Sequence, residues 1–208
     1  LKDEIDHETF LGWQETFCSS SGTCSMMGTA NTMGCFLEAT GLAPFGSATM
    51  AAHDAAKARQ GRDVGERIVR LVKEKAPFQD YFSRENLENG IRYISASGAS
   101  TNAVLHLLAC SSVMGLEMDL SEFDRIQSSV PVVGKFKPSS PYNIDDFNTA
   151  GGVPALMAAI RDFLHLDINL SMGGTLGDFL KTVQPGAGKI IRPADNPLEN
   201  NGCYAILK

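Results

Sequence analysis

The sequence predicts an α/β protein that is predominantly helical over the 208 residues present. Apolar residues recur every three or four positions in many segments, which is typical of helices with one buried face. Turns rich in Gly, Pro and Ser separate these segments. Strand signals are few, at residues 131–133 and 203–207. A larger sheet would therefore have to come from parts of the protein outside this chain.

The first half of the chain is expected to form successive helices that begin at polar residues and end at glycine or proline. Residues 41–46 carry the Gly and Pro that end one buried helix, and Ser47 is placed to cap the next. A later helix carries an apolar stripe of Val64, Ile68, Leu71 and Val72. The expected helices are a lead-in within residues 1–21, residues 30–40, 47–59 and 62–75, and a helix opened by Ser83.

The second half continues in the same way. Pro154 suits the first turn of a helix, where its missing N–H costs nothing. Residues 184–202 are rich in Gly, Pro and Asn, which indicates a linker. The helices expected here are residues 103–114, a short helix from Ser121, and residues 144–150, 155–164 and 175–183.

Bulk composition excludes several classes of function. The chain is 43% hydrophobic and 20% charged, with a net charge of −6 and no basic cluster, which argues against a nucleic-acid partner. No apolar run approaches the ~20 residues of a membrane span. The acidic N-terminus does not resemble a signal peptide, so a cytoplasmic protein, or one of an organelle matrix, is expected. The missing start methionine suggests that the chain begins inside a longer polypeptide.

The cysteines do not form a familiar metal-binding pattern. They stand at positions 18, 24, 35, 110 and 203. Their number is odd and their spacing matches neither a zinc ribbon nor a ferredoxin. Reduced thiols in a cytosolic compartment are therefore expected, and composition alone favours small core residues over metal ligands.

Cys24 stands apart because it lies in a small polar turn that runs into an apolar helix. Small residues let a bulky prosthetic group approach, and amides at a helix start favour anions, including a thiolate-bound cluster. Residues 98–102 form a second turn of this kind. Both turns are expected to lie close together and to face one pocket, although simple helix capping explains the second turn equally well.

Several sequence motifs occur in a fixed order. They are GTCSMMGTANTM at 22–33, LEATGL at 37–42, GASTNAVLHLLA at 98–109, AGGVP at 150–154, IRPADNPL at 191–198 and GCYAIL at 202–207. With these motifs the chain resembles the iron–sulfur dehydratase family of dihydroxy-acid and 6-phosphogluconate dehydratases over nearly its whole length. One departure is Ala99, where the family usually has a second glycine.

The resemblance implies a hydro-lyase that dehydrates a 2,3-dihydroxy acid or sugar acid to a 2-oxo acid. An iron–sulfur cluster, 2Fe–2S or 4Fe–4S, acts as Lewis acid, Mg²⁺ binds the substrate, and a serine of the C-terminal domain is the base. Of the family's three cluster cysteines only Cys24 has a counterpart in this chain. The serine base has no counterpart here, so no catalytic residue is assigned. Thr23, Ser100, Thr101 and Asn102 are implied to contact the substrate.

The resemblance also implies an organisation. Residues 1–183 would belong to the N-terminal domain, 184–202 to a linker and 203–208 to the start of a C-terminal domain. A homodimer or higher homo-oligomer is implied as well. The motif residues Gly-Thr-Cys at 22–24 and Gly-Thr-Ala-Asn-Thr at 28–32 favour the sugar-acid branch of the family. The nearest alternative is dihydroxy-acid dehydratase of branched-chain amino acid synthesis. A non-catalytic truncated module is the alternative, because two cluster cysteines and the base have no counterpart in the chain.

The remaining candidates are expected to be structural. Cys35, Cys110 and Cys203 are interpreted as core residues, and Cys18 is not at a ligand position of the family. His106 is expected to be a structural histidine with its polar atoms satisfied. His53 and His165 are expected at the surface. Asn31 and Thr32 either support the Cys24 turn or only pack their own helix.

Overall fold

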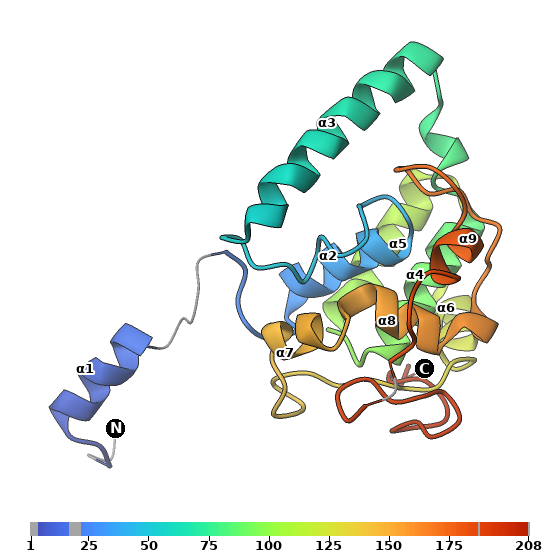
Figure 1. Ribbon diagram of the computed structural model, residues 1–208. Coiled ribbons are helices and arrows are strands. Elements are labelled where there is room, and N and C mark those ends of the chain that lie inside the picture. The colour runs from blue at the N-terminus through green and yellow to red at the C-terminus, as the bar shows by residue number, and fades with distance from the viewer. Residues whose placement is uncertain (1–3, 17–21, 187, 208) are drawn as a thin grey trace.

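The computed structural model describes residues 4–16, 22–186 and 188–207. This part of the chain forms nine α-helices and two short 3-10 helices, joined by turns (Figure 1). They are α1 (His7–Thr16), α2 (Thr29–Ala39), α3 (Ala55–Glu74), η1 (Phe78–Asp80), α4 (Arg84–Ala96), α5 (Asn102–Val113), α6 (Leu120–Gln127), α7 (Ile144–Thr149), α8 (Gly152–Ala159), η2 (Arg161–Phe163) and α9 (Leu176–Leu180).

The core forms around α2 and α4, which pack against each other and against α5 and α8. Phe36 of α2 and Ile91 and Tyr93 of α4 are almost wholly buried there. The two helices approach closely because Gly90 has no side chain: a Cβ at that position would overlap the Phe36 ring. The predicted helix at residues 30–40 is thus confirmed as the central buried helix of the domain.

Most predicted helices are present, but the one expected at residues 47–59 is wrong. Residues 45–53 form turns, and α3 begins only at Ala55, where the Asp54 carboxylate accepts a hydrogen bond from Ala56 N at 2.8 Å. The stretch expected as two helices is therefore one helix of 20 residues from Ala55 onwards. An Asp cap replaces the Ser47 cap because the backbone around Ser47 is bonded to the carboxylate of Glu38.

Strand pairing in the described residues is limited to isolated bridges. Val132 pairs with Glu199 and Gly134 with Ile191, so residues 131–133 contribute a bridge rather than a strand. The strand expected at residues 203–207 is wrong, since these residues have no regular structure. The prediction of a predominantly helical chain is confirmed. The domain boundaries at 183 and 202 remain predictions, although the segment after 188 bonds back through Arg192 N to Val133 O at 2.8 Å.

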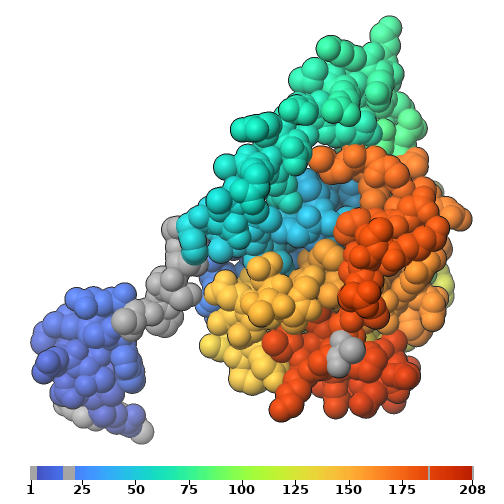
Figure 2. Space-filling model, in the orientation of Figure 1, coloured from blue at the N-terminus to red at the C-terminus, as the bar shows by residue number. Residues whose placement is uncertain are grey.

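Helix α3 lies along the outside of the molecule and forms a ridge in the space-filling view (Figure 2). It contacts the body through a few polar bonds, including one from Arg67 Nε to Ser171 O at 2.6 Å. None of its residues is buried, so its predicted apolar stripe faces solvent for the most part. Among the helices of the described residues, none is long and apolar enough to cross a membrane.

Candidate functional site

Cys24 lies on the turn that leads into α2, and its side chain is exposed and free. The turn requires glycine at its start, because Gly22 has a φ of +110° and a Cβ there would lie 2.9 Å from the Ala52 Cβ. Backbone bonds fix the far side of the turn, from Ile144 N to Ser25 O and from Met27 N to Lys137 O, each 2.9 Å long. The thiol is therefore presented from a well-anchored backbone.

Asn31, in the first turn of α2, holds this turn from beneath. Its side-chain Nδ2 donates to Cys24 O at 2.6 Å and to Met26 O at 2.7 Å, while the residue is 2% exposed. Removing this side chain would leave the carbonyl oxygens of Cys24 and Met26 without this donor, which would lower the stability and release the turn. The geometry thus favours the interpretation in which Asn31 supports the Cys24 turn over helix packing alone.

A cavity of about 300 Å³ opens beside the turn. Thr23, Cys24 and Asn31 line one part of it, and Lys57 and Asp145 bring one charge of each sign. Lys57 is fixed by a hydrogen bond from its Nζ to Ser47 O at 2.5 Å. The cavity is therefore polar, open to solvent and bordered by an exposed thiol.

Glu38 organises the wall of this cavity from inside the protein. Its carboxylate accepts hydrogen bonds from Gly46 N at 2.6 Å and from Ala48 N at 2.8 Å, and the residue is fully buried. Burial raises the pKa of this carboxyl to about 7, against the lowering effect of the two amides and of Lys57. The loop of residues 45–49 is thereby attached to α2.

The second polar turn is also attached to the start of α2. Ser100 N donates to Thr32 Oγ1 at 3.1 Å, and Asn102 Nδ2 donates to Thr29 Oγ1 at 2.6 Å. Thr32 therefore attaches the second turn to α2 rather than only packing its helix. The residues that line the cavity include Thr23 and Cys24 but not Ser100, Thr101 or Asn102. Their contact with a substrate remains a prediction.

The other cysteines differ from Cys24 in their surroundings. Cys35 is fully buried, and burial raises the pKa of its thiol to about 12. Burial likewise raises the pKa of Cys203 to about 11, and Cys110 is half-buried. Cys35 is therefore a core residue, as predicted, whereas Cys110 and Cys203 are only partly buried and lie outside the hydrophobic core. Cys18 lies outside the described residues.

The histidines follow expectation only in part. His53 is exposed, as predicted, but His106 is exposed too, so the prediction of a satisfied structural histidine is wrong. Position 106 falls on the face of α5 that the described part of the chain leaves uncovered, next to Leu105, which is 71% exposed. The apolar sequence around it gave no sign of which face would be covered.

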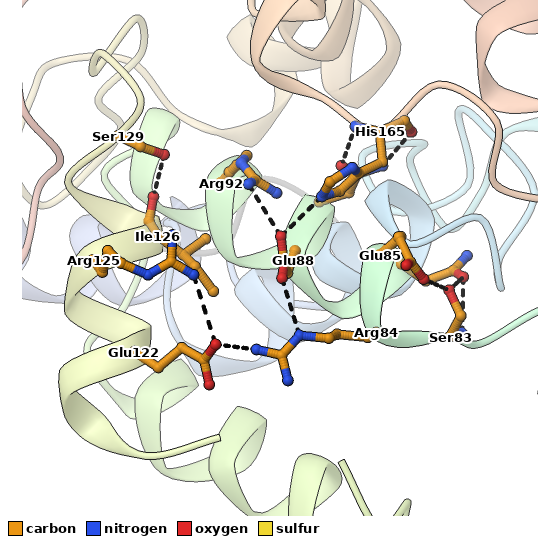
Figure 3. Close-up of polar contacts among 12 residues, drawn as sticks. Ser83, Arg84, Glu85, Glu88, Arg92, Glu122, Arg125, Ile126, Ser129 and His165 are labelled. Atoms are coloured by element: carbon orange, nitrogen blue, oxygen red, sulfur yellow. Dashed lines mark hydrogen bonds and ion pairs between the residues drawn. The ribbon is translucent and has the colours of Figure 1, made fainter. Parts of the chain in front are cut away.

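His165 takes part in an ion-pair cluster that the sequence analysis missed (Figure 3). Its Nε2 lies 2.8 Å from Glu88 Oε2, which also accepts from Arg92 Nη2 at 3.1 Å. Arg84 Nε contacts the other oxygen of Glu88 at 3.2 Å. Burial opposes ionisation of Glu88, but His165 and Arg92 together lower its pKa. The four-residue spacing of Arg84, Glu88 and Arg92 was the available signal.

Cys24 fits a cluster ligand in chemistry and exposure, but the described residues bring it no partners. Within 4–16, 22–186 and 188–207, no group of three or more His, Cys, Asp or Glu side chains is placed to hold a metal ion. The cavity thus offers one thiol donor, the carboxylate of Asp145, a lysine and a set of hydroxyl and amide groups. A metal cluster bound here would need further ligands from elsewhere.

A helical domain that presents one exposed cysteine on a turn before its central helix is the structure that the motifs of this sequence indicate. The chain belongs to the dihydroxy-acid/6-phosphogluconate dehydratase N-terminal family, whose profile matches residues 1–179.

Named relatives agree with this family. The chain is 38% identical to dihydroxy-acid dehydratase of Microcystis aeruginosa (strain NIES-843 / IAM M-2473) and 40% identical to that of Synechococcus sp. (strain CC9605), over 99% of its own length in both cases. It is 32% identical to dihydroxy-acid dehydratase of Dehalococcoides mccartyi, again over 99% of its length. It covers 37%, 38% and 37% of these relatives, and so spans well under half of each.

Proposed function

We propose that this chain is the N-terminal portion of a hydro-lyase that dehydrates a small 2,3-dihydroxy acid to a 2-oxo acid. The observation that carries the proposal is the exposed thiol of Cys24, held by Asn31 on a turn beside a polar cavity. Family membership and the names of the relatives supply the reaction class. The relatives' names favour the dihydroxy-acid branch over the sugar-acid branch that the motif wording suggested.

Cys24 would hold one iron of an iron–sulfur cluster. Such a cluster, when bound, supplies a Lewis acid for the leaving hydroxyl. Other residues of this chain would position Cys24 and border the space for the substrate. Asn31 orients the Cys24 backbone, and Thr23 and Lys57 border the space that a substrate would enter. A hydroxy acid carries a carboxylate, which a lysine at the edge of a polar cavity can attract.

The remaining parts of the proposal concern groups outside the described cavity. Mg²⁺, the other cluster ligands and the proton-abstracting base would come from elsewhere in a longer polypeptide, together with homo-oligomer formation in a reducing, cytoplasmic compartment. The second candidate, a non-catalytic module, is favoured by the single thiol at the site. Both candidates predict that the 208-residue chain alone neither binds a stable cluster nor turns over, and the mass of the intact polypeptide distinguishes them.

The test is Cys24→Ser in a polypeptide that carries this chain together with the remainder of the relatives' length. We expect loss of the visible sulfur-to-iron absorbance and of dehydratase activity together, because serine is a poor replacement for a thiolate ligand. Cys110→Ser is the matched control, since Cys110 is a free, half-buried thiol on α5, and it should keep both signals. Full cluster absorbance in Cys24→Ser would overturn the assignment.

A further inference from the structure

One loop of the chain forms a continuous part of the wall of the candidate-site cavity. We define the cavity loop as residues 46–52, most of which line the cavity. Its start is held by Glu38 of α2, which is fully buried. One carboxylate oxygen of Glu38 accepts from Gly46 N at 2.6 Å, and the other accepts from Ala48 N at 2.8 Å. A buried carboxyl group therefore fixes the backbone at the edge of the site.

A single peptide group connects Glu38 with the lysine of the cavity. Ala48 N–H, which donates to Glu38, and Ser47 C=O are the two ends of one planar peptide unit. The carbonyl end accepts a hydrogen bond from Lys57 Nζ at 2.5 Å. Lys57 is half-buried, and its ammonium has N–H donors beyond the one that Ser47 O accepts. The orientation of this peptide unit, which Glu38 fixes at one end, thus determines where Lys57 offers its remaining donors.

Glu38 is a group whose charge changes near neutral pH. Burial raises its pKa to about 7, while the two loop amides and Lys57 act in the opposite direction. Two further titratable groups act on it, Cys35 of α2 and Tyr93 of α4. Burial raises the pKa of Cys35 to about 12 and that of Tyr93 well above its ordinary value, so both stay neutral near pH 7. Helix α8, which also packs on α2, contributes no titratable side chain.

We propose that Glu38 is a positioning residue: its ionised side chain orients the peptide unit of Ser47 and Ala48 and thereby holds Lys57 in place for the carboxylate of a small hydroxy acid. The ligand class rests on the proposed function. A protonated carboxyl carries a donor on one oxygen, so it can no longer accept from both loop amides, and the peptide that holds Lys57 is released. The cavity should therefore bind a carboxylate more tightly at about pH 8 than at about pH 6.

The experiment uses the 208-residue chain, isotope-labelled for nuclear magnetic resonance, and glycerate as the simplest 2,3-dihydroxy acid. The backbone amide protons of Gly46 and Ala48 should titrate with a midpoint near the Glu38 pKa of about 7. The affinity for glycerate should fall roughly fivefold between about pH 8 and about pH 6, which corresponds to the loss of about one hydrogen bond. Free hydroxy acids and lysine side chains ordinarily keep their charge over this range. Glycerol, the matched ligand without a carboxylate, should show no such dependence.

The effect of the ligand on the titration separates positioning from simple charge contact. If the ionised form of Glu38 favours glycerate, then glycerate favours the ionised form by the same factor. Saturating glycerate should therefore move the midpoint of the Gly46 and Ala48 titration to lower pH. A ligand that only neutralised Lys57 would move the midpoint to higher pH, because Lys57 is one of the groups that lower the pKa of Glu38.

Two variants divide the pathway at Glu38 and at Lys57. Glu38→Gln should bind glycerate at about pH 8 as weakly as the unmodified chain does at about pH 6, and without a pH dependence, because the amide offers only one acceptor oxygen. Lys57→Met should weaken glycerate binding at every pH while the two loop amides still titrate. Where Glu38→Gln loses its helical circular dichroism, the titrations of the unmodified chain decide, since they need no variant.

Two matched controls should keep the pH dependence of binding. Glu88→Gln makes the same chemical change at another hydrogen-bonded carboxylate, on α4, which is not among the residues that line the cavity. His53→Gln removes the exposed histidine that follows the cavity loop. This control matters because histidine is the side chain that most often changes charge near neutral pH.

Several results would overturn the proposal. They are equal glycerate affinity at about pH 6 and about pH 8, no binding at either pH, a midpoint that glycerate moves to higher pH, and a pH dependence that Glu38→Gln keeps or His53→Gln abolishes. The Cys24→Ser test measures cluster absorbance and activity in the longer polypeptide and needs no glycerate binding by this chain. The two proposals therefore fail separately.

Discussion

Helices α2 and α3 follow one another in the chain and both carry an apolar stripe, yet their surroundings are opposite. Helix α2 buries six of its 11 residues against α4, α5 and α8, whereas α3 buries none of its 20. Helical periodicity states that a face will be covered but does not say by what. Other segments of this chain thus cover the apolar face of α2, whereas the apolar stripe of α3 stays largely exposed.

The polar residues of the two helices differ in the same sense. In α2 the buried polar side chains each bond to a neighbouring segment: Asn31 to the Cys24 turn, Thr32 to Ser100 and Glu38 to the loop before α3. In α3 most charged side chains face water. Helix α2 therefore determines the geometry of the candidate site, while α3 contributes Lys57 at its first turn and little else.

The largest effect that separates the two helices should come from truncating one apolar side chain on each. Phe36→Ala in α2 should lower the free energy of unfolding by about 3–5 kcal/mol, because it empties a fully packed position. Ile68→Ala in α3 should change it by no more than about 0.5 kcal/mol in the monomer, since Ile68 is already 54% exposed. Urea unfolding at low protein concentration measures both. Equal losses would contradict the assignment of α3 as an uncovered helix.

The next effect concerns Glu38 and is a dependence on pH. Its pKa is about 7 in the folded protein against an ordinary value of 4.5, because burial disfavours the carboxylate. Between these values the folded state binds the proton and the unfolded state does not. The contribution of Glu38 to the free energy of unfolding is therefore fully present below about pH 4.5. It declines by about 3 kcal/mol as the pH rises to about 7.

Glu38→Gln provides the comparison for that dependence. The variant should lose stability at low pH, because the amide cannot accept the bonds from both Gly46 N and Ala48 N without a mismatch. It should also lose the decline between about pH 4.5 and about pH 7, whatever its absolute stability. Urea titrations at several pH values measure the slope. An unchanged slope in Glu38→Gln would assign the pH dependence to other groups.

Much of the fold could be predicted because local signals and burial agree. Ser83 predicted the start of α4, and its backbone N donates to Asn86 Oδ1 at 2.9 Å. The start of α3 could not be placed in this way. Ser47 has the chemistry of a cap, but the buried carboxylate of Glu38 bonds the loop around it, and that contact joins residues ten positions apart in the chain.

The residues of the candidate site were likewise predicted where the signal is local and missed where it is not. The sequence identified Cys24 through its small polar neighbours, which are local. It left the role of Asn31 open, because a side chain that bonds Cys24 O is indistinguishable in sequence from one that packs a helix. Lys57 and Asp145 were missed. Asp145 lies 121 positions after Cys24, so no local signal shows that the two residues line one cavity, and Lys57 was expected inside a different helix.

The smallest expected effect comes from replacing one glycine where α4 packs on α2 and one glycine in α3. Gly90→Ala should destabilise the domain by about 1–3 kcal/mol, because the new methyl group overlaps the Phe36 ring where α4 packs on α2. Gly65→Ala in α3 should instead stabilise the monomer by about 0.5–1 kcal/mol, since its Cβ would meet nothing within 4 Å among the described residues and alanine favours a helix. Thermal unfolding measures both variants. A loss of monomer stability in Gly65→Ala would mean that α3 packs against its own chain at this point, and the contrast between α2 and α3 would not hold there.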